Sequence, residues 1–166
     1  MELNFMIIAI AALVPPVLGF IWYNPKTFGN VWMKAAGLKE ESLKEFNMAK
    51  VFILTYIFSF MAGLILQSMV IHQYSIYSVM MNEPGFGENG SEIMLYIEEF
   101  MSKYGTNFRT FGHGVLHGVI GGLFLILPVI AVNGLFERKG FVYVAINTGF
   151  WTVCLALMGG IICAYA

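Results

Sequence analysis

Four long apolar runs dominate the pattern of hydrophobic and polar positions along the chain. They cover residues 5–23, 51–71, 115–136 and 141–165, and none of them contains Asp, Glu, Lys or Arg. A helix needs about 20 apolar residues to cross the hydrocarbon core of a bilayer, and backbone groups in lipid must be hydrogen-bonded within their own segment. The pattern therefore predicts an all-α membrane protein with four transmembrane helices, built as a single domain over residues 1–166.

Shorter helical patterns lie between the spans. In the first loop, Pro25 can open a helix and Gly37 can end one, which predicts an interfacial helix between them. Residues 38–50 then form a charged helical lead into the second span. In the middle loop, residues 92–104 carry apolar side chains at helical spacing, which predicts an amphipathic helix on the outer surface.

The basic residues predict which loops face the cytoplasm. Five Lys and Arg residues lie in the first loop and two in the third, against two in the middle loop. Loops rich in Lys and Arg stay on the cytoplasmic side. The sequence therefore predicts a protein of the cell membrane with its first and third loops inside, and with both termini and the middle loop outside.

Composition agrees with a lipid-covered surface. Only 11% of the residues are charged and 58% are hydrophobic, whereas soluble domains carry about 25% charged residues. The net charge of -1 gives no reason to expect a nucleic acid as a partner. Cys154 and Cys163 fall on opposite faces of one helix, so they are expected to pack as small apolar residues and not to pair.

All three histidines of the chain are predicted to lie near the outer face. His72 ends the second span, and His113 and His117 stand one helical turn apart at the start of the third. Together they could bind a divalent metal, ligate a haem or take part in proton transfer. A further ligand would have to come from the middle loop, with Glu98 or Glu99 as candidates. The alternative is a structural role, in which the imidazoles are exposed to water or hydrogen-bonded between helix ends.

The third span also carries a ridge of glycines. Gly114, Gly118 and Gly122 are spaced four apart, so another helix can approach this ridge closely. A flat cofactor would need the same clearance.

Prolines and asparagines mark the remaining irregular positions of the spans. Pro15, Pro16 and Pro128 are expected to kink the first and third spans. Asn133 and Asn147 lie toward the cytoplasmic end, where they would hydrogen-bond between helices or line a polar vestibule.

Several kinds of activity find no support in the spans. They contain no carboxylate pair, nucleophile triad or nucleotide-binding loop, so nothing in them indicates an enzyme. Ion-coupled carriers usually place an ionisable residue near the midplane of the bilayer. The lack of Asp, Glu, Lys and Arg in the spans argues against such a carrier, although a solute channel needs none.

Two separated motifs resemble one protein family. The segment GFIWYNP at residues 19–25, followed by Trp32, and the segment NGLFERK at residues 133–139, followed by Asn147, are similar, in that order, to the domain of unknown function 1761 family. The resemblance implies a small, mostly bacterial, four-span protein of the inner membrane, and it transfers no activity. The motif positions of unknown role are Trp22, Tyr23, Pro25, Trp32, Asn133 and Asn147.

The sequence is therefore consistent with three functions. The first is a self-associating or accessory structural membrane subunit, either a homo-oligomer or part of a larger complex, suggested by the glycine ridge and the small size of the chain. The second is a small-solute channel at an oligomer interface. The third is a haem- or metal-binding membrane protein that uses His72, His113 and His117.

Overall fold

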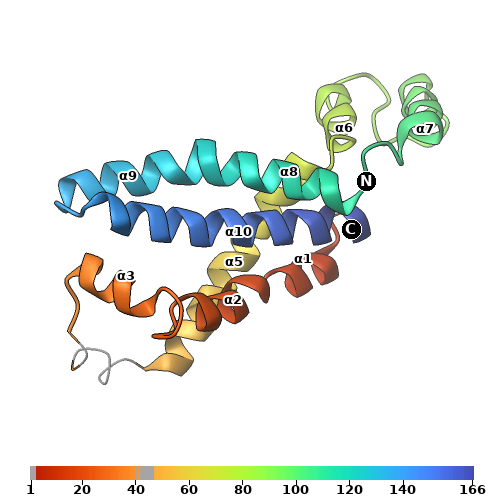
Figure 1. The fold of residues 1–166 in the computed structure, drawn as a ribbon. Helices are drawn as coiled ribbons and strands as arrows, with labels where there is room; N and C mark the ends of the chain where they lie inside the picture. The colour runs from red at the N-terminus through yellow and green to blue at the C-terminus, as the bar shows by residue number, and fades with distance from the viewer. Residues whose placement is uncertain (1–2, 40, 42–46) are drawn as a thin grey trace.

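The computed structural model describes residues 3–39, 41 and 47–166, and within them every regular element is helical (Figure 1). The elements are α1 (Phe5–Ala11), α2 (Val14–Trp22), α3 (Gly29–Ala36), α5 (Met48–Val70), α6 (Tyr74–Met80), α7 (Glu92–Tyr104), α8 (Phe111–Gly121), the π-helical turn η1 (Gly122–Ile126), α9 (Leu127–Phe136) and α10 (Phe141–Tyr165).

Four helical stretches are long and apolar enough to cross a membrane: Phe5–Trp22, Met48–Val70, Phe111–Phe136 and Phe141–Tyr165. The all-helical class with four such stretches is therefore confirmed. Two of them begin earlier than predicted because polar residues cap them. Asn47 accepts a hydrogen bond from the backbone of Lys50, and Thr110 accepts one from the backbone of His113.

The expected distortions at the prolines are present. The first stretch is interrupted between α1 and α2, with Pro15 and Pro16 in the first turn of α2. In the third stretch the widened turn η1 precedes Pro128, which lies at the start of α9. Because proline lacks a backbone N–H and its ring clashes with the carbonyl four residues back, the helix cannot pass through either position unchanged.

α10 lies at the centre of the arrangement, between α8 and α9 on one side and α1 and α2 on the other (Figure 1). The glycines of the third stretch face this helix. A methyl group added at Gly114, Gly118 or Gly122 would overlap Gly159, Leu155 or Thr152 of α10, respectively. The glycine ridge is thus filled within the chain, and it gives no support to self-association.

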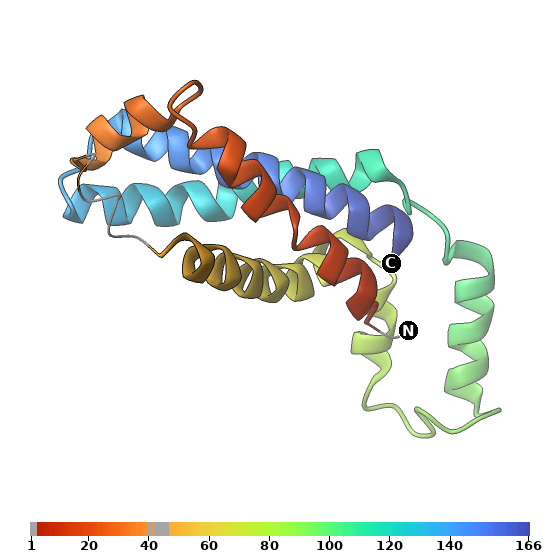
Figure 2. The same cartoon turned by 90° about the horizontal axis from the view of Figure 1, so that it is seen from below.

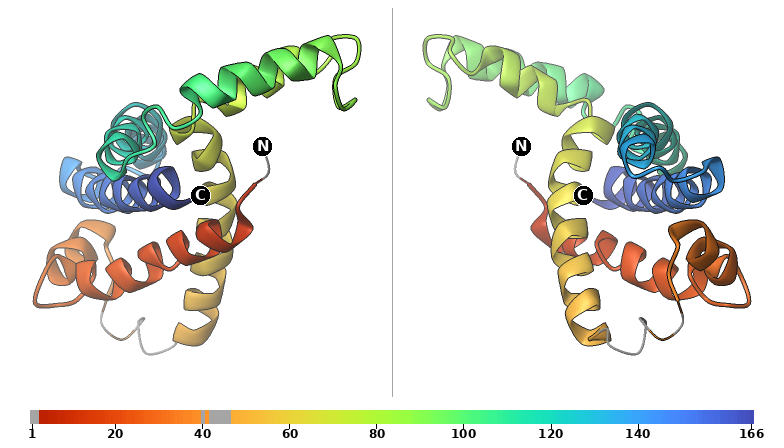
Figure 3. Two further views of the ribbon diagram at one scale, coloured as in Figure 1. Left: turned by 90° about the vertical axis from the view of Figure 1, so that its right-hand side faces the viewer. Right: turned by 90° about the vertical axis from the view of Figure 1, so that its left-hand side faces the viewer.

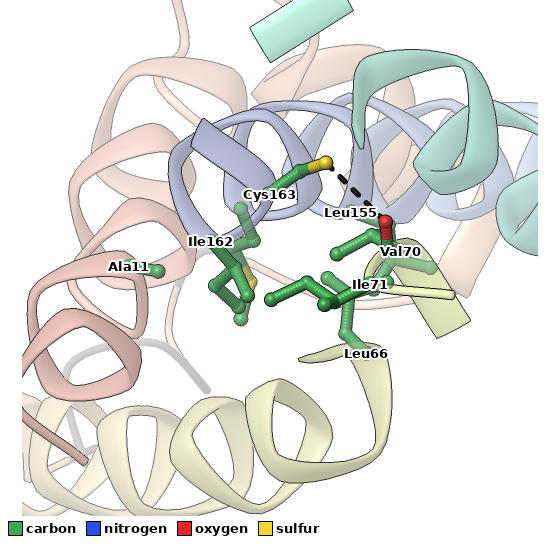
Figure 4. Close-up of a cluster of buried hydrophobic side chains, with 8 residues drawn as sticks. Ala11, Leu66, Val70, Ile71, Leu155, Ile162 and Cys163 are labelled. Atoms are coloured by element: carbon green, nitrogen blue, oxygen red, sulfur yellow. Dashed lines mark hydrogen bonds between the residues drawn. The ribbon is translucent and has the colours of Figure 1, made fainter. Parts of the chain in front are cut away.

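The buried core lies where α1, α5 and α10 meet (Figure 4). It comprises Ala11, Leu66, Val70, Ile71, Leu155, Met158, Ile162 and Cys163. The Cys163 thiol donates to the carbonyl of Val70 at 3.3 Å, and both cysteines are free and buried. The prediction that they would not pair is confirmed.

The loops separate into two ends of the molecule. At one end, Lys139 Nζ donates to the carbonyl of Ala36 at 2.5 Å, so the turn before α10 meets the end of α3. At the other end lie both termini, α6 and α7 (Figures 1 and 2). Loops one and three therefore share one end, as predicted, while their assignment to the cytoplasm stays a prediction.

The first loop differs in detail from the expectation. Pro25 does not open a helix: it lies in a turn in which the Thr27 hydroxyl donates to the carbonyl of Trp22 at 2.8 Å, and α3 begins only at Gly29. Gly37 ends α3 as predicted, with a left-handed φ of 73°. Of the predicted charged lead over 38–50, residues 40 and 42–46 lie outside the described residues, and residues 48–50 form the first turn of α5.

The middle loop forms two helices that project together from the end of the spans (Figures 2 and 3). α7 covers Glu92–Tyr104, where the apolar spacing predicted a helix, and the Ser91 hydroxyl caps it by accepting from the backbone of Met94. The short helix α6 was not predicted. The placement of α7 on an outer membrane surface remains a prediction.

Candidate metal centre

Two helix ends bring the three histidines together. α5 stops at Val70, and Ile71 follows with extended backbone angles, so the chain turns sharply and carries His72 toward the start of α8. The Thr110 cap fixes that start. His113 and His117 then lie one turn apart on the same side of α8.

The reactive nitrogens of the three rings converge. His72 Nε2 lies 2.9 Å from Nε2 of His113 and 3.1 Å from Nε2 of His117. One ligand nitrogen from each ring lies within 4.8 Å of the other two. The sequence predicted only that these residues share one end of the molecule, and the structure brings them into direct contact.

This arrangement is difficult to satisfy by hydrogen bonds alone. A neutral imidazole has one N–H and one lone pair, so Nε2 of His72 cannot donate to both neighbours. Three imidazole nitrogens this close together instead form a donor set that suits a metal ion. Zn–N bonds of about 2.0–2.1 Å in a tetrahedral site separate neighbouring nitrogens by about 3.3 Å, close to the two contacts above.

The same geometry favours a single ion over a haem. The ring centroids of the three histidines are 4.5–5.0 Å apart. Two axial imidazoles of a haem must stand further apart because the macrocycle lies between them. His72 is exposed and the other two rings are half-buried, so a bound ion would keep an open coordination position.

No carboxylate joins this group among the residues that the structure describes. Glu99 forms an ion pair with Lys103 of the same helix, with the nitrogen 2.6 Å from the carboxylate oxygen, and Glu98 is exposed on α7. The expectation that one of these two residues would complete the site finds no support. Among the described residues, the candidate ligands are the three histidines.

A cavity of about 330 Å³ opens beside His72. Its lining residues are His72, Gln73, Phe100, Tyr104, Asn107 and Phe108. The Gln73 side chain is buried, and its Nε2 donates to the carbonyls of Tyr104 and Asn107 at 3.1 and 2.8 Å. These bonds tie the end of α7 to the turn that holds His72.

The sequence did not predict this cavity. Gln73, Asn107 and Phe108 lie between regular elements, where no periodic pattern reveals which face they occupy. Phe108 has a left-handed φ of 60°, which is rare for a bulky residue. Its ring centroid lies 5.2 Å from that of His113, so the turn presents an aromatic surface directly to the histidines.

A second polar and aromatic cluster lies at the opposite end. The Tyr23 hydroxyl donates to Asn147 Oδ1 at 3.0 Å, and the Tyr23 ring lies 5.0 Å from that of Trp32. Burial raises the pKa of Tyr23, so the phenol remains a neutral donor. Trp22 contacts Phe150 of α10 at a centroid distance of 6.2 Å. The motif residues Trp22, Tyr23, Trp32 and Asn147 are therefore brought together.

The other two motif positions lie apart from this contact. Pro25 is in the exposed turn before α3, where its carbonyl accepts from Asn30 Nδ2 at 3.0 Å. Asn133 is exposed on α9. Asn133 thus lies outside the contact that engages Asn147, which separates these two of the asparagines expected to line a polar vestibule.

A family comparison accounts for these motifs. The family described as "Protein of unknown function (DUF1761)" matches residues 6–163, nearly the whole chain. The chain belongs to the DUF1761 family. No curated protein and no solved structure matches it, so for this DUF1761 protein the functional argument depends on the residues themselves.

The two ends of the DUF1761 chain offer different chemistry. The end with Tyr23 and Asn147 joins α2, α3 and α10 through aromatic contacts and a neutral hydrogen bond, which suits a structural role. The end with His72, His113 and His117 gathers three side chains that could hold a metal ion, beside a cavity.

Proposed function

We propose that this DUF1761 protein is an integral membrane protein that binds one divalent transition-metal ion through His72, His113 and His117. The observation that carries the proposal is the convergence of three imidazole nitrogens, within 4.8 Å of one another, from two helix ends. Four apolar helices support the membrane location. The distribution of Lys and Arg supports an orientation with the metal centre and both termini on the outer side of the cell membrane.

Zn²⁺ is the ion that fits this donor set best. Imidazole nitrogens suit Zn²⁺ and neighbouring first-row ions, whereas Mg²⁺ and Ca²⁺ prefer oxygen ligands. Three histidines and one open position are the ligand set of zinc sites that bind a water or substrate, while purely structural zinc sites have four protein ligands. The open position therefore favours a site that binds an external molecule.

The other two functions draw less support from the structure. Self-association was suggested by the glycine ridge, which α10 fills within the chain. A channel at an oligomer interface would need a polar surface facing a second copy, and Asn147 is engaged with Tyr23 inside the chain. The metal centre is therefore the function supported by the most specific geometry.

Metal binding is tested directly on the purified protein. We expect protein stripped of metal in detergent to bind one Zn²⁺ or Co²⁺ per chain and to retain it through gel filtration, as measured by elemental analysis. Mg²⁺ is the matched control and is expected to be lost. Because imidazole binds metal only when neutral, occupancy should fall when the pH is lowered enough to protonate the histidines. Protein that retains no Zn²⁺ or Co²⁺ at neutral pH would contradict the proposal.

A further inference from the structure

We infer that the cavity beside His72 binds a small amphiphilic carboxylate, with the carboxylate on the metal ion and the apolar body among the aromatic side chains. The inference rests on the proposed metal site and names the class of ligand that takes its open position. Charge, lining, volume and location each support it.

The positive charge of the bound metal ion favours an anion at its open coordination position. Three neutral imidazoles leave the full charge of a divalent ion uncompensated, and within the described part of the chain no carboxylate joins the group. Glu99 is paired with Lys103. An unpaired charge in a partly desolvated site is costly, so an anionic ligand stabilises the loaded centre.

The aromatic lining of the cavity favours an anion that carries an apolar body. Phe100 and Tyr104 pack together on α7 with ring centroids 5.1 Å apart, and Phe108 closes the side next to the histidines. The amide nitrogen of Gln73 already donates to two backbone carbonyls. The metal, not this amide, is therefore the group that would hold the carboxylate.

The volume of the cavity suits a small ligand. At about 330 Å³ it lies at the lower end of the range for small-molecule sites, which suits an acid of about ten non-hydrogen atoms. Octanoate and 3-phenylpropanoate both have this size. The first represents acids released from lipids, which the proposed position at the membrane boundary would supply, and the second represents water-soluble aromatic acids.

The test uses the visible absorption of Co²⁺ bound to the full-length protein in nanodiscs. Octanoate, 3-phenylpropanoate and acetate are titrated separately, and each changes the cobalt spectrum when its carboxylate binds the metal. We expect at least one of the two larger acids to change the cobalt spectrum at a concentration about tenfold lower than acetate requires, because its apolar body is buried. The tighter of the two identifies the source of the ligand, lipid or aromatic acid.

Variants of α7 distinguish binding of the acid in the cavity from binding of the metal ion. Phe100→Ala is expected to weaken binding of the larger acid about tenfold while leaving the affinity of the protein for Co²⁺ unchanged. Tyr96→Ala is the matched control, because Tyr96 lies on the same helix, is exposed, and does not line the cavity. Equal potency of all three acids, or an unchanged titration in Phe100→Ala, would overturn the inference while leaving the metal site intact. Failure to bind Co²⁺ at all would instead overturn the proposed function.

Discussion

Replacing Gly118 by alanine is expected to destabilise the protein by about 3 kcal/mol, the upper end of the usual cost of overpacking a close contact. An added Cβ would overlap the backbone carbonyl of Leu155 and the backbone nitrogen of Ala156. Backbone atoms of a long central helix cannot move aside as the end of a flexible side chain can. α8 would have to separate from α10, and close packing between these helices would be lost.

Thermal unfolding in detergent measures this effect, and the same helix offers a matched control. Gly112 has no atom within 4 Å of an added Cβ, so Gly112→Ala is expected to leave the melting temperature unchanged or raise it slightly, since alanine favours the helix. Equal melting temperatures for Gly118→Ala and Gly112→Ala would contradict the close packing of α8 on α10.

Replacing His117 by alanine is expected to weaken Zn²⁺ binding by more than the roughly 10–100-fold lost when an outer-shell partner of a metal ligand is removed. His117 would supply one of only three protein ligands, and its loss leaves two nitrogens that cannot hold the ion against water. The same loss is expected for His72→Ala and His113→Ala. Competition with a chelating dye of known affinity measures each dissociation constant.

Two glutamates supply the control for the histidine variants. Glu98→Gln and Glu99→Gln remove carboxylates of α7 that lie outside the histidine group, and both variants are expected to bind Zn²⁺ as the unaltered protein does. The melting temperature without metal shows that each histidine variant remains folded. Full Zn²⁺ affinity in His117→Ala, or its loss in Glu98→Gln, would mean that the ligand set is different.

The architecture was predictable because charge is absent from long stretches of the chain. The four apolar runs and the spacing over residues 92–104 predicted helices that the structure contains. The boundaries were less predictable. Single polar caps decide them, as Thr110 does for α8, and a hydropathy pattern does not register one hydroxyl group.

The candidate site was predictable only in part. Sequence placed the three histidines at one end, but their contact depends on the extended backbone of Ile71, which redirects His72 toward α8. The cavity depends on Phe108 in a left-handed conformation, which no periodic pattern predicts.

The glycine ridge illustrates a different limit of sequence reasoning. Spacing shows that a helix can approach Gly114 and Gly118, but not which helix does so. Here the partner is α10 of the same chain, where Gly159 provides the matching gap. The glycine ridge therefore gives no evidence for self-association.

X-ray absorption at the zinc edge of the Zn²⁺-loaded protein tests the metal centre most directly. The proposed site predicts about three imidazole nitrogens at about 2.0–2.1 Å and one further oxygen. A zinc bound through sulfur at about 2.3 Å, or one surrounded by oxygen atoms alone, would show that His72, His113 and His117 do not form the site.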